Sequence, residues 1–194
     1  MTLSPLYTQD ERAMVMSEAP ILAISGTPGV GKTKLCSFLN LSGFTVVDLK
    51  ELAQTHGCLG EEDPKDGAAP IDIHALADAW NPAENEKIAI DGHLSHLLHV
   101  DGIVLLRCEP SILEQRLSSR GYDEHKVRSN VEWEMTAGHW SELIEFEVEL
   151  PVLEMDTTSH SAEELSATVL AWVEGGCESL PLEKAVLEAI DWLS

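Results

Sequence analysis

Residues 26–33 have the types and spacing of a loop that binds phosphate groups. They read GTPGVGKT and fit the pattern G-x-x-x-x-G-K-[ST], between an apolar run and a helical run. Gly29 and Gly31 let the backbone N–H groups turn toward phosphate oxygens, and the helix that follows adds positive charge at its N-terminus. We expect Lys32 to reach the β- and γ-phosphates of ATP and the Thr33 hydroxyl to ligate Mg²⁺.

Asp91 and His93 follow a second apolar run and are candidates for the same chemistry. A carboxylate at Asp91 could help to hold the Mg²⁺ shell, or it could simply cap a turn. His93 could orient a water molecule or hydroxyl near the γ-phosphate, or it could be a structural histidine. The H-x-x-H-x-x-H spacing of His93, His96 and His99 suggests a metal site, but the spread of these side chains around a helix argues against one.

Arg116 and Arg120 lie four residues apart on a helical stretch that ends at Gly121. Two guanidinium groups on one helix face repel each other unless an anion lies between them. Arg116 has no acidic residue three or four positions away, so the usual salt bridge within a helix is missing. The pattern predicts a phosphate clamp in a mobile lid, with a solvated arginine pair as the alternative.

The elements that must position these residues alternate between strands and helices. Helical periodicity lies between five short apolar runs, and a last amphipathic piece covers 182–193. Because several runs are apolar at consecutive positions, they suit strands buried on both faces. The alternation predicts an α/β fold with a five-stranded parallel sheet flanked by helices. The expected strands are 21–25, 44–49, 87–91, 102–108 and 152–155, and the expected helices are near 32–42, 71–80, 110–120, 124–148 and 161–174.

The composition and net charge of the chain exclude several classes of protein. The chain has 194 residues, 44% of them hydrophobic, which excludes general disorder. Its net charge of −22 argues against direct nucleic-acid binding and against an anionic membrane surface. No apolar run approaches membrane-spanning length, so we expect no membrane association. The excess of acidic residues has two interpretations. It forms a solvated surface that keeps the protein in solution, or it is an adaptation to high salt. The four cysteines are far apart in the sequence, which predicts reduced thiols in a cytoplasmic protein. They are Cys36, Cys58, Cys108 and Cys177.

In their order along the chain, these motifs resemble the adenylate kinase isoenzyme 6 family, also called coilin-interacting nuclear ATPase protein. The resemblance rests on GTPGVGKT, DGH and RLSSRGYDEHKVRSNVEWE, and it covers about residues 20–174. It implies a P-loop NTPase similar to adenylate kinase, with a short monophosphate-binding insert at about 45–70 and a short lid at about 119–129. The kinase domain is then 20–176, between a loose extension at 1–19 and a helical extension at 177–194.

The resemblance also implies site residues. Gly29, Gly31, Lys32 and Thr33 match the ATP loop of the family, and Lys34 stands where the family often has threonine or serine. Asp91 and His93 match the family's Walker B pair, and Arg120 matches its lid arginine. One departure is Gln54, which stands where some relatives have the arginine of D-L-A-R.

The implied function is transfer of the γ-phosphate of MgATP to AMP or another nucleoside monophosphate, with ATPase activity. The family also implies a role in 16S rRNA and small-subunit maturation, through a basic ribosomal protein, the universal small-subunit protein eleven. The alternative is an ATPase assembly factor for the small ribosomal subunit with little kinase activity, which Gln54 favours. A third interpretation is a kinase of another small hydroxyl or acid substrate.

Overall fold

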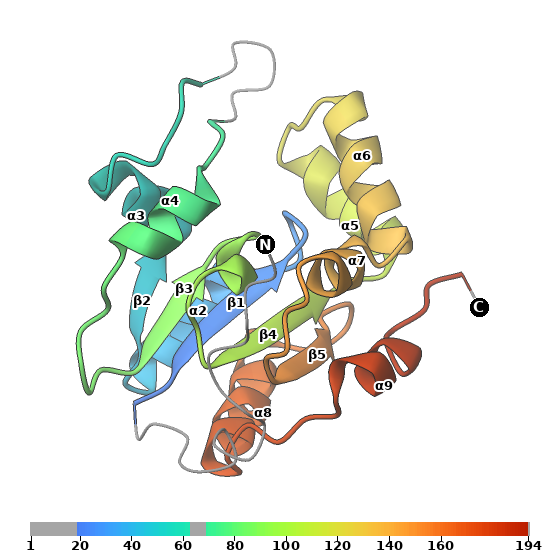
Figure 1. Ribbon diagram of the computed structural model, residues 1–194. Coiled ribbons are helices and arrows are strands. Elements are labelled where there is room, and N and C mark those ends of the chain that lie inside the picture. Colours follow the sequence, from blue (N-terminus) through green and yellow to red (C-terminus); the bar gives the residue numbers. More distant parts are fainter. Residues whose placement is uncertain (1–18, 63–68, 194) are drawn as a thin grey trace.

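Five short parallel strands form one sheet, in the order β2-β3-β1-β4-β5 (Figure 1). The computed structural model describes residues 19–62 and 69–193. The α/β fold with a five-stranded parallel sheet, predicted from the alternation, is confirmed. β1 and β4 lie at the centre and are buried along nearly their whole length, as their continuous apolar runs indicate. The strands are β1 (Ile21–Gly26), β2 (Thr45–Asp48), β3 (Ile88–Asp91), β4 (Gly102–Arg107) and β5 (Val152–Asp156).

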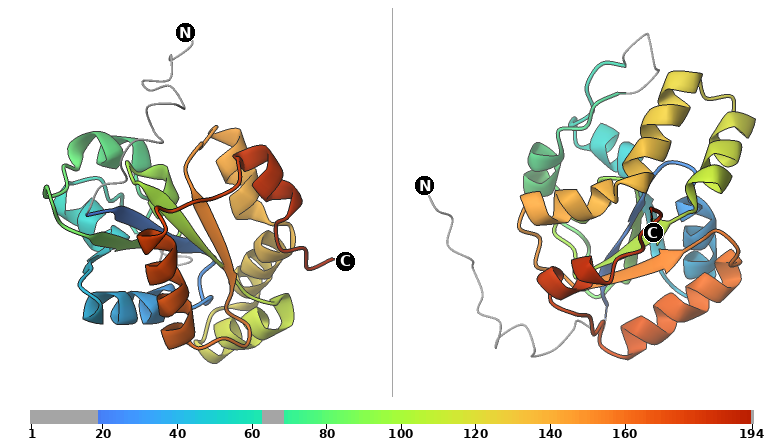
Figure 2. Two further views of the ribbon diagram at one scale, coloured as in Figure 1. Left: turned by 90° about the horizontal axis from the view of Figure 1, so that it is seen from below. Right: turned by 90° about the vertical axis from the view of Figure 1, so that its right-hand side faces the viewer.

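Helices cover both faces of the sheet (Figure 2). One core contains side chains of α2, α5 and α8, and a second core on the other face contains side chains of α3, α4 and α7. The helices are α2 (Lys32–Leu41), α3 (Leu49–Thr55), α4 (Ile73–Ala79), η1 (Ser95–Leu97), α5 (Pro110–Ser119), α6 (Glu124–Met135), α7 (Gly138–Glu145), α8 (Ala162–Glu174) and α9 (Leu182–Leu187).

The single helix expected at 124–148 is wrong, because the chain breaks between α6 and α7. Ala137 adopts a left-handed conformation with φ 51° and ends the run of helical hydrogen bonds. A Cβ atom on Gly138 would lie 2.2 Å from Cδ2 of Trp133, so only glycine fits there. The break turns α7 back across the sheet, which brings His139 and Trp140 into the interior.

The region after β2 also differs from expectation. The strand ends at Asp48, whose carboxylate accepts a hydrogen bond from the backbone N–H of Glu51 and caps α3, a helix that the apolar pattern did not predict. In the loop between α3 and α4, within the insert expected at about 45–70, Leu59 pairs with Ile71 in an isolated antiparallel bridge. Residues 63–68 of that loop lie outside the described part of the chain, as does the expected N-terminal extension up to residue 18.

The topology gathers the functional loops at one edge. Because all five strands are parallel, the loops after β1, β3, β4 and β5 leave from the same side of the sheet. The helix pairs α3–α4 and α5–α6 lie on opposite sides of the loop after β1 (Figure 1). Across the described residues, the structure contains no helix of the length and apolarity that a bilayer crossing requires.

Candidate active site

The loop between β1 and α2 has the geometry of a phosphate cradle. Gly26 and Gly31 have φ values of 134° and 110°, which side chains with a Cβ atom rarely adopt. At Gly26 a Cβ atom would also fall 2.4 Å from the carbonyl oxygen of Leu106. The Lys32 ammonium lies over the loop and donates to the carbonyl oxygens of Gly26 at 2.7 Å and Thr27 at 3.1 Å. Lys32 is therefore held where phosphate oxygens would meet the loop.

Thr33 and Asp91 are brought together although they are far apart in the sequence. β3 runs beside β1, so its last residue lies next to the first turn of α2. The Thr33 hydroxyl donates to a carboxylate oxygen of Asp91 at 2.6 Å. A hydroxyl and a carboxylate are oxygen ligands of the kind that Mg²⁺ takes beside nucleotide phosphates. The donor set present therefore fits a magnesium ion.

A cavity of about 610 Å³ opens from the phosphate loop. Its volume is within the range of small-molecule sites. One wall is the loop itself with Gly29, Gly31 and Lys34. Another part of the lining comes from the segment between β5 and α8, including His160 and Ser161, which sequence reasoning missed. The predicted topology could have indicated this segment, because it follows a parallel strand and so leaves the same edge of the sheet as the phosphate loop.

The two arginines line this cavity but differ in their partners. Arg116 donates to the carbonyl oxygens of Thr157 at 2.9 Å and Thr158 at 3.3 Å, so it fixes the wall after β5. Backbone carbonyls thus accept hydrogen bonds from Arg116 in the absence of an anion, and the phosphate clamp of the two arginines stays a prediction. Arg120 lies at the C-terminal end of α5, and no carboxylate among the described residues forms an ion pair with it. Arg120 is thus the guanidinium available to an anion.

His93 lies outside the lining of the cavity, in the loop after β3. Its side chain is exposed, and its backbone carbonyl accepts a hydrogen bond from Ser25 at 2.9 Å. Although part of the residue is exposed, desolvation by the atoms packed around its ring and the positive charge of Lys32 lower the pKa of His93 to about 4. The imidazole is therefore neutral at physiological pH.

Comparisons with known proteins agree with this geometry. Residues 22–137 match a family model described as an AAA domain. The chain is 39% identical to a "Putative adenylate kinase" of Archaeoglobus fulgidus, over 90% of this chain and 92% of the relative. Proteins of the same name in Pyrococcus abyssi and Methanocaldococcus jannaschii are 35% and 32% identical, over 91% and 92% of their lengths. The chain belongs to this archaeal adenylate kinase family. The narrower resemblance to isoenzyme 6 stays a prediction.

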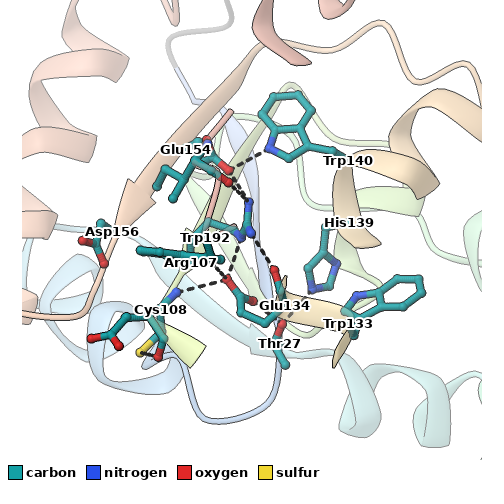
Figure 3. Close-up of polar contacts among 12 residues, drawn as sticks. Thr27, Arg107, Cys108, Trp133, Glu134, His139, Trp140, Glu154, Asp156 and Trp192 are labelled. Atoms are coloured by element: carbon teal, nitrogen blue, oxygen red, sulfur yellow. Dashed lines mark hydrogen bonds and ion pairs between the residues drawn. The ribbon is translucent and has the colours of Figure 1, made fainter. Parts of the chain in front are cut away.

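A buried ion-pair network supports the phosphate loop of this family member from below (Figure 3). Arg107 and Glu134 are each about 1% exposed, and Nε of Arg107 donates to Oε1 of Glu134 at 2.6 Å. Arg107 also donates to Glu154 at 2.7 Å. The other oxygen of Glu134 accepts the Thr27 hydroxyl at 2.5 Å. Sequence reasoning missed Glu134, because only the packing of α6 against the sheet brings it under the loop.

The C-terminal segment is tied to the same network. Trp192 Nε1 donates to Glu134 at 3.2 Å, and the backbone N–H of Ile190 donates to Glu154 at 2.8 Å. Glu154 also accepts Trp140 Nε1 at 2.7 Å. The segment after α9 therefore closes over a buried charge cluster beside the end strand of the sheet.

We expect MgATP binding to be coupled to proton uptake at Lys32. Desolvation lowers the pKa of Lys32 to about 8, although the carboxylate of Asp91 opposes this shift. At about pH 9 most of the unliganded protein then has a neutral Lys32, whereas bound phosphates favour the charged form. Calorimetry in two buffers of different ionisation enthalpy should show uptake of nearly one proton at about pH 9 and almost none at about pH 7. Equal uptake by Lys32→Ala at about pH 9 would contradict this assignment.

Proposed function

We propose that this protein transfers the γ-phosphoryl group of MgATP to AMP or another nucleoside monophosphate. The observation that carries the proposal is that the phosphate loop, Lys32, Thr33 and Arg120 line one shared cavity, with Asp91 hydrogen-bonded to Thr33. The family of archaeal adenylate kinases supports the same reaction class. Such a transfer depends on positioning and charge neutralisation more than on a general base.

Each residue of the phosphate loop has a distinct role in this proposal. Backbone N–H groups around Gly29 and Gly31 hold the phosphates of ATP, and Lys34 lines the same wall. Lys32 leaves the loop carbonyls and neutralises charge on the β- and γ-phosphates. Bound Mg²⁺ would supply further neutralisation of the phosphate oxygens. Thr33 would ligate it directly and Asp91 would hold its outer shell.

The wall after β5 is the proposed site of the ATP base. It lies on the same cavity as the phosphate loop, and its backbone is fixed by the Arg116 hydrogen bonds to Thr157 and Thr158. His160 and Ser161 offer polar groups on that wall. Arg116 is therefore a positioning residue here, in contrast to Arg120.

Arg120→Ala should lower kcat by roughly 10²-fold while the affinity for MgATP changes much less. The reason is that a lid guanidinium without a carboxylate partner acts mainly on charge that develops in the transition state. Steady-state kinetics with nucleotide binding measured separately provide the test. Arg128→Ala is the matched control, because Arg128 is an exposed arginine that belongs to the same expected lid but does not line the cavity, so it tests whether any lid charge suffices. A raised KM with unchanged kcat would make Arg120 a ground-state anchor.

The acceptor site is proposed between α3–α4 and the phosphate loop. α3 contains Gln54, which is exposed, at the position where the resemblance places an arginine for AMP. The identity of the acceptor is tested by incubating the protein with MgATP and, in turn, AMP, CMP, GMP and UMP. Formation of the matching diphosphate from AMP above the others would support adenylate kinase activity. Equal rates with and without every monophosphate would refute the transfer reaction.

Gln54 and the net charge of −22 favour a second candidate, an ATPase assembly factor for the small ribosomal subunit. Weak monophosphate binding would leave hydrolysis as the main outcome, and an acidic surface attracts basic proteins and repels bare RNA. A pull-down with the basic small-subunit ribosomal protein and with an rRNA fragment, each at two salt concentrations, tests this candidate. Salt-sensitive binding to the protein alone supports it, and binding to RNA alone refutes it.

His93→Ala should separate hydrolysis from transfer. A neutral imidazole beside the end of β3 is suited to orienting water, so its loss should lower phosphate release at least about 10-fold. AMP-dependent ADP formation should fall less, because its acceptor is held by other residues. Following phosphate and ADP in the same reactions measures both. Equal loss of both activities together with a lowered melting temperature would indicate a structural histidine.

A further inference from the structure

Two buried histidines, His96 and His139, and the partly exposed Glu142 form a cluster that the proposed reaction does not use. His96 lies in η1, and the other two lie in α7. Their ligand atoms all lie within 4.8 Å of one another, and the two imidazoles are 1% and 5% exposed. His96 Nε2 and His139 Nδ1 are buried and have no hydrogen-bond partner among the described residues. Two buried polar atoms without a hydrogen bond therefore lie next to one carboxylate, whose side chain is 19% exposed.

Hydrogen bonds on the far side of His96 fix its tautomer. Nδ1 of His96 lies 2.9 Å from the Ser25 hydroxyl. That hydroxyl donates its own hydrogen to the carbonyl oxygen of His93 at 2.9 Å. The hydrogen between Ser25 and His96 must then come from Nδ1 of the imidazole. A neutral His96 consequently presents the lone pair of Nε2 toward Glu142.

The same argument applies to His139 (Figure 3). Its Nε2 lies 3.4 Å from the Thr27 hydroxyl, which donates to Glu134 at 2.5 Å. Because the Thr27 hydrogen is already used, Nε2 of His139 is the donor in the contact with Thr27. A neutral His139 therefore presents the lone pair of Nδ1 toward Glu142.

Two lone pairs and a carboxylate repel one another unless a proton or a metal cation lies between them. Oε2 of Glu142 is 3.4 Å from each imidazole nitrogen. Neither contact has the geometry of a hydrogen bond, unlike the contact of His139 with Thr27. The two distances from Glu142 match the edge of a tetrahedron around Zn²⁺, because metal–ligand distances of about 2.0–2.1 Å place neighbouring ligand atoms about 3.3–3.4 Å apart. The two imidazole nitrogens lie within 4.8 Å of each other, so they would draw closer together around an ion.

We infer that His96, His139 and Glu142 bind a divalent transition metal of the Zn²⁺ class. Two imidazoles and one carboxylate are a ligand set for zinc, whereas Mg²⁺ prefers oxygen ligands alone. Three protein ligands leave the fourth position to water. Ser25 and Thr27 hold the far nitrogens of the two imidazoles, as outer partners of metal-binding histidines commonly do.

The position of this site indicates what the metal does. Ser25 ends the apolar part of β1, and Thr27 belongs to the phosphate loop. A metal bound here ties η1 and α7 to the underside of that loop. It is separate from the Thr33–Asp91 pair, which lies at the start of α2. The metal is thus expected to stabilise the fold and to hold the loop in place.

The test is metal titration of the full chain after treatment with a chelator. Co²⁺ should give one equivalent of tetrahedral absorption per chain. A 100-fold excess of Zn²⁺ over its Kd should raise the melting temperature by roughly 5–10 °C. Glu142→Gln and His96→Gln should weaken metal binding at least about 10-fold. Two matched variants should bind metal as the wild type does, namely Glu145→Gln, an exposed glutamate of α7, and His99→Gln, an exposed histidine nearby.

Asp91→Asn distinguishes this site from the magnesium site and should also leave Co²⁺ binding unchanged. Absence of a tetrahedral spectrum in the wild type would overturn the inference, and that result does not depend on any variant being folded. Wild-type affinity in both Glu142→Gln and His96→Gln would also overturn it. So would loss of Co²⁺ binding in Asp91→Asn alone.

Discussion

Lys32→Ala is expected to lower turnover by about 10²–10³-fold, the scale for removing one preorganised charge donor. Lys32 is held over the phosphate loop by the carbonyl oxygens of Gly26 and Thr27. Its pKa of about 8 indicates that its charge is poorly compensated before phosphates bind. The fold should therefore tolerate the loss, with little change in melting temperature. Both AMP-dependent transfer and ATP hydrolysis should fall together.

The control is Lys184→Ala, because Lys184 is an exposed lysine of α9 outside the cavity. It should keep wild-type rates. Near wild-type rates of transfer and hydrolysis in Lys32→Ala would show that the loop is not the active site. A fall in turnover accompanied by unfolding would require nucleotide binding to be measured on the folded fraction.

Glu134→Ala is expected to lower the free energy of unfolding by about 3–5 kcal/mol, because it leaves the buried charge of Arg107 with one carboxylate instead of two. For a chain of this size, that loss corresponds to a fall in melting temperature of roughly 6–20 °C. The Thr27 hydroxyl and Trp192 would lose an acceptor at the same time. Thermal and urea unfolding measure the effect.

Two variants isolate the cause of this loss. Glu132→Ala removes an exposed glutamate of the same helix and should change the free energy of unfolding by less than about 0.5 kcal/mol. Thr27→Val keeps the ion pair with Arg107 but removes the hydroxyl from the phosphate loop, so its effect should be larger on turnover than on stability. A Glu134→Ala protein as stable as Glu132→Ala would contradict the structural role of the network.

The strands could be predicted from the sequence because both of their faces are buried. β1 and β4 are apolar at consecutive positions. In a chain where apolar runs alternate with helical patterns, such a run indicates a strand that is buried on both faces. α3 was missed because its beginning depends on one polar contact, the carboxylate of Asp48 with the N–H of Glu51. The break at Ala137 was missed because it depends on how Trp133 packs over Gly138. Neither contact leaves a periodic signal.

The residues of the candidate site also fall into two groups, those that the sequence could predict and those that it could not. The phosphate loop is local, so its eight residues could be recognised together with their strand and helix. The pairing of Thr33 with Asp91 follows from two neighbouring parallel strands. Glu134 and His139 lie more than 100 residues from Thr27 in the sequence, and only tertiary packing brings them to it. Spacing alone grouped His96 with His93 and His99, whereas the fold groups it with His139 and Glu142.

The proposed transfer reaction is tested most directly by following ADP and inorganic phosphate separately, with MgATP alone and with AMP added. If the cavity transfers phosphoryl groups, ADP formation should depend on AMP, with two ADP formed for each ATP consumed. Phosphate release should remain a small fraction of that turnover, because lid closure excludes water. Release of one phosphate for each ADP, at a rate that AMP does not change, would contradict the account and favour the ATPase assembly factor.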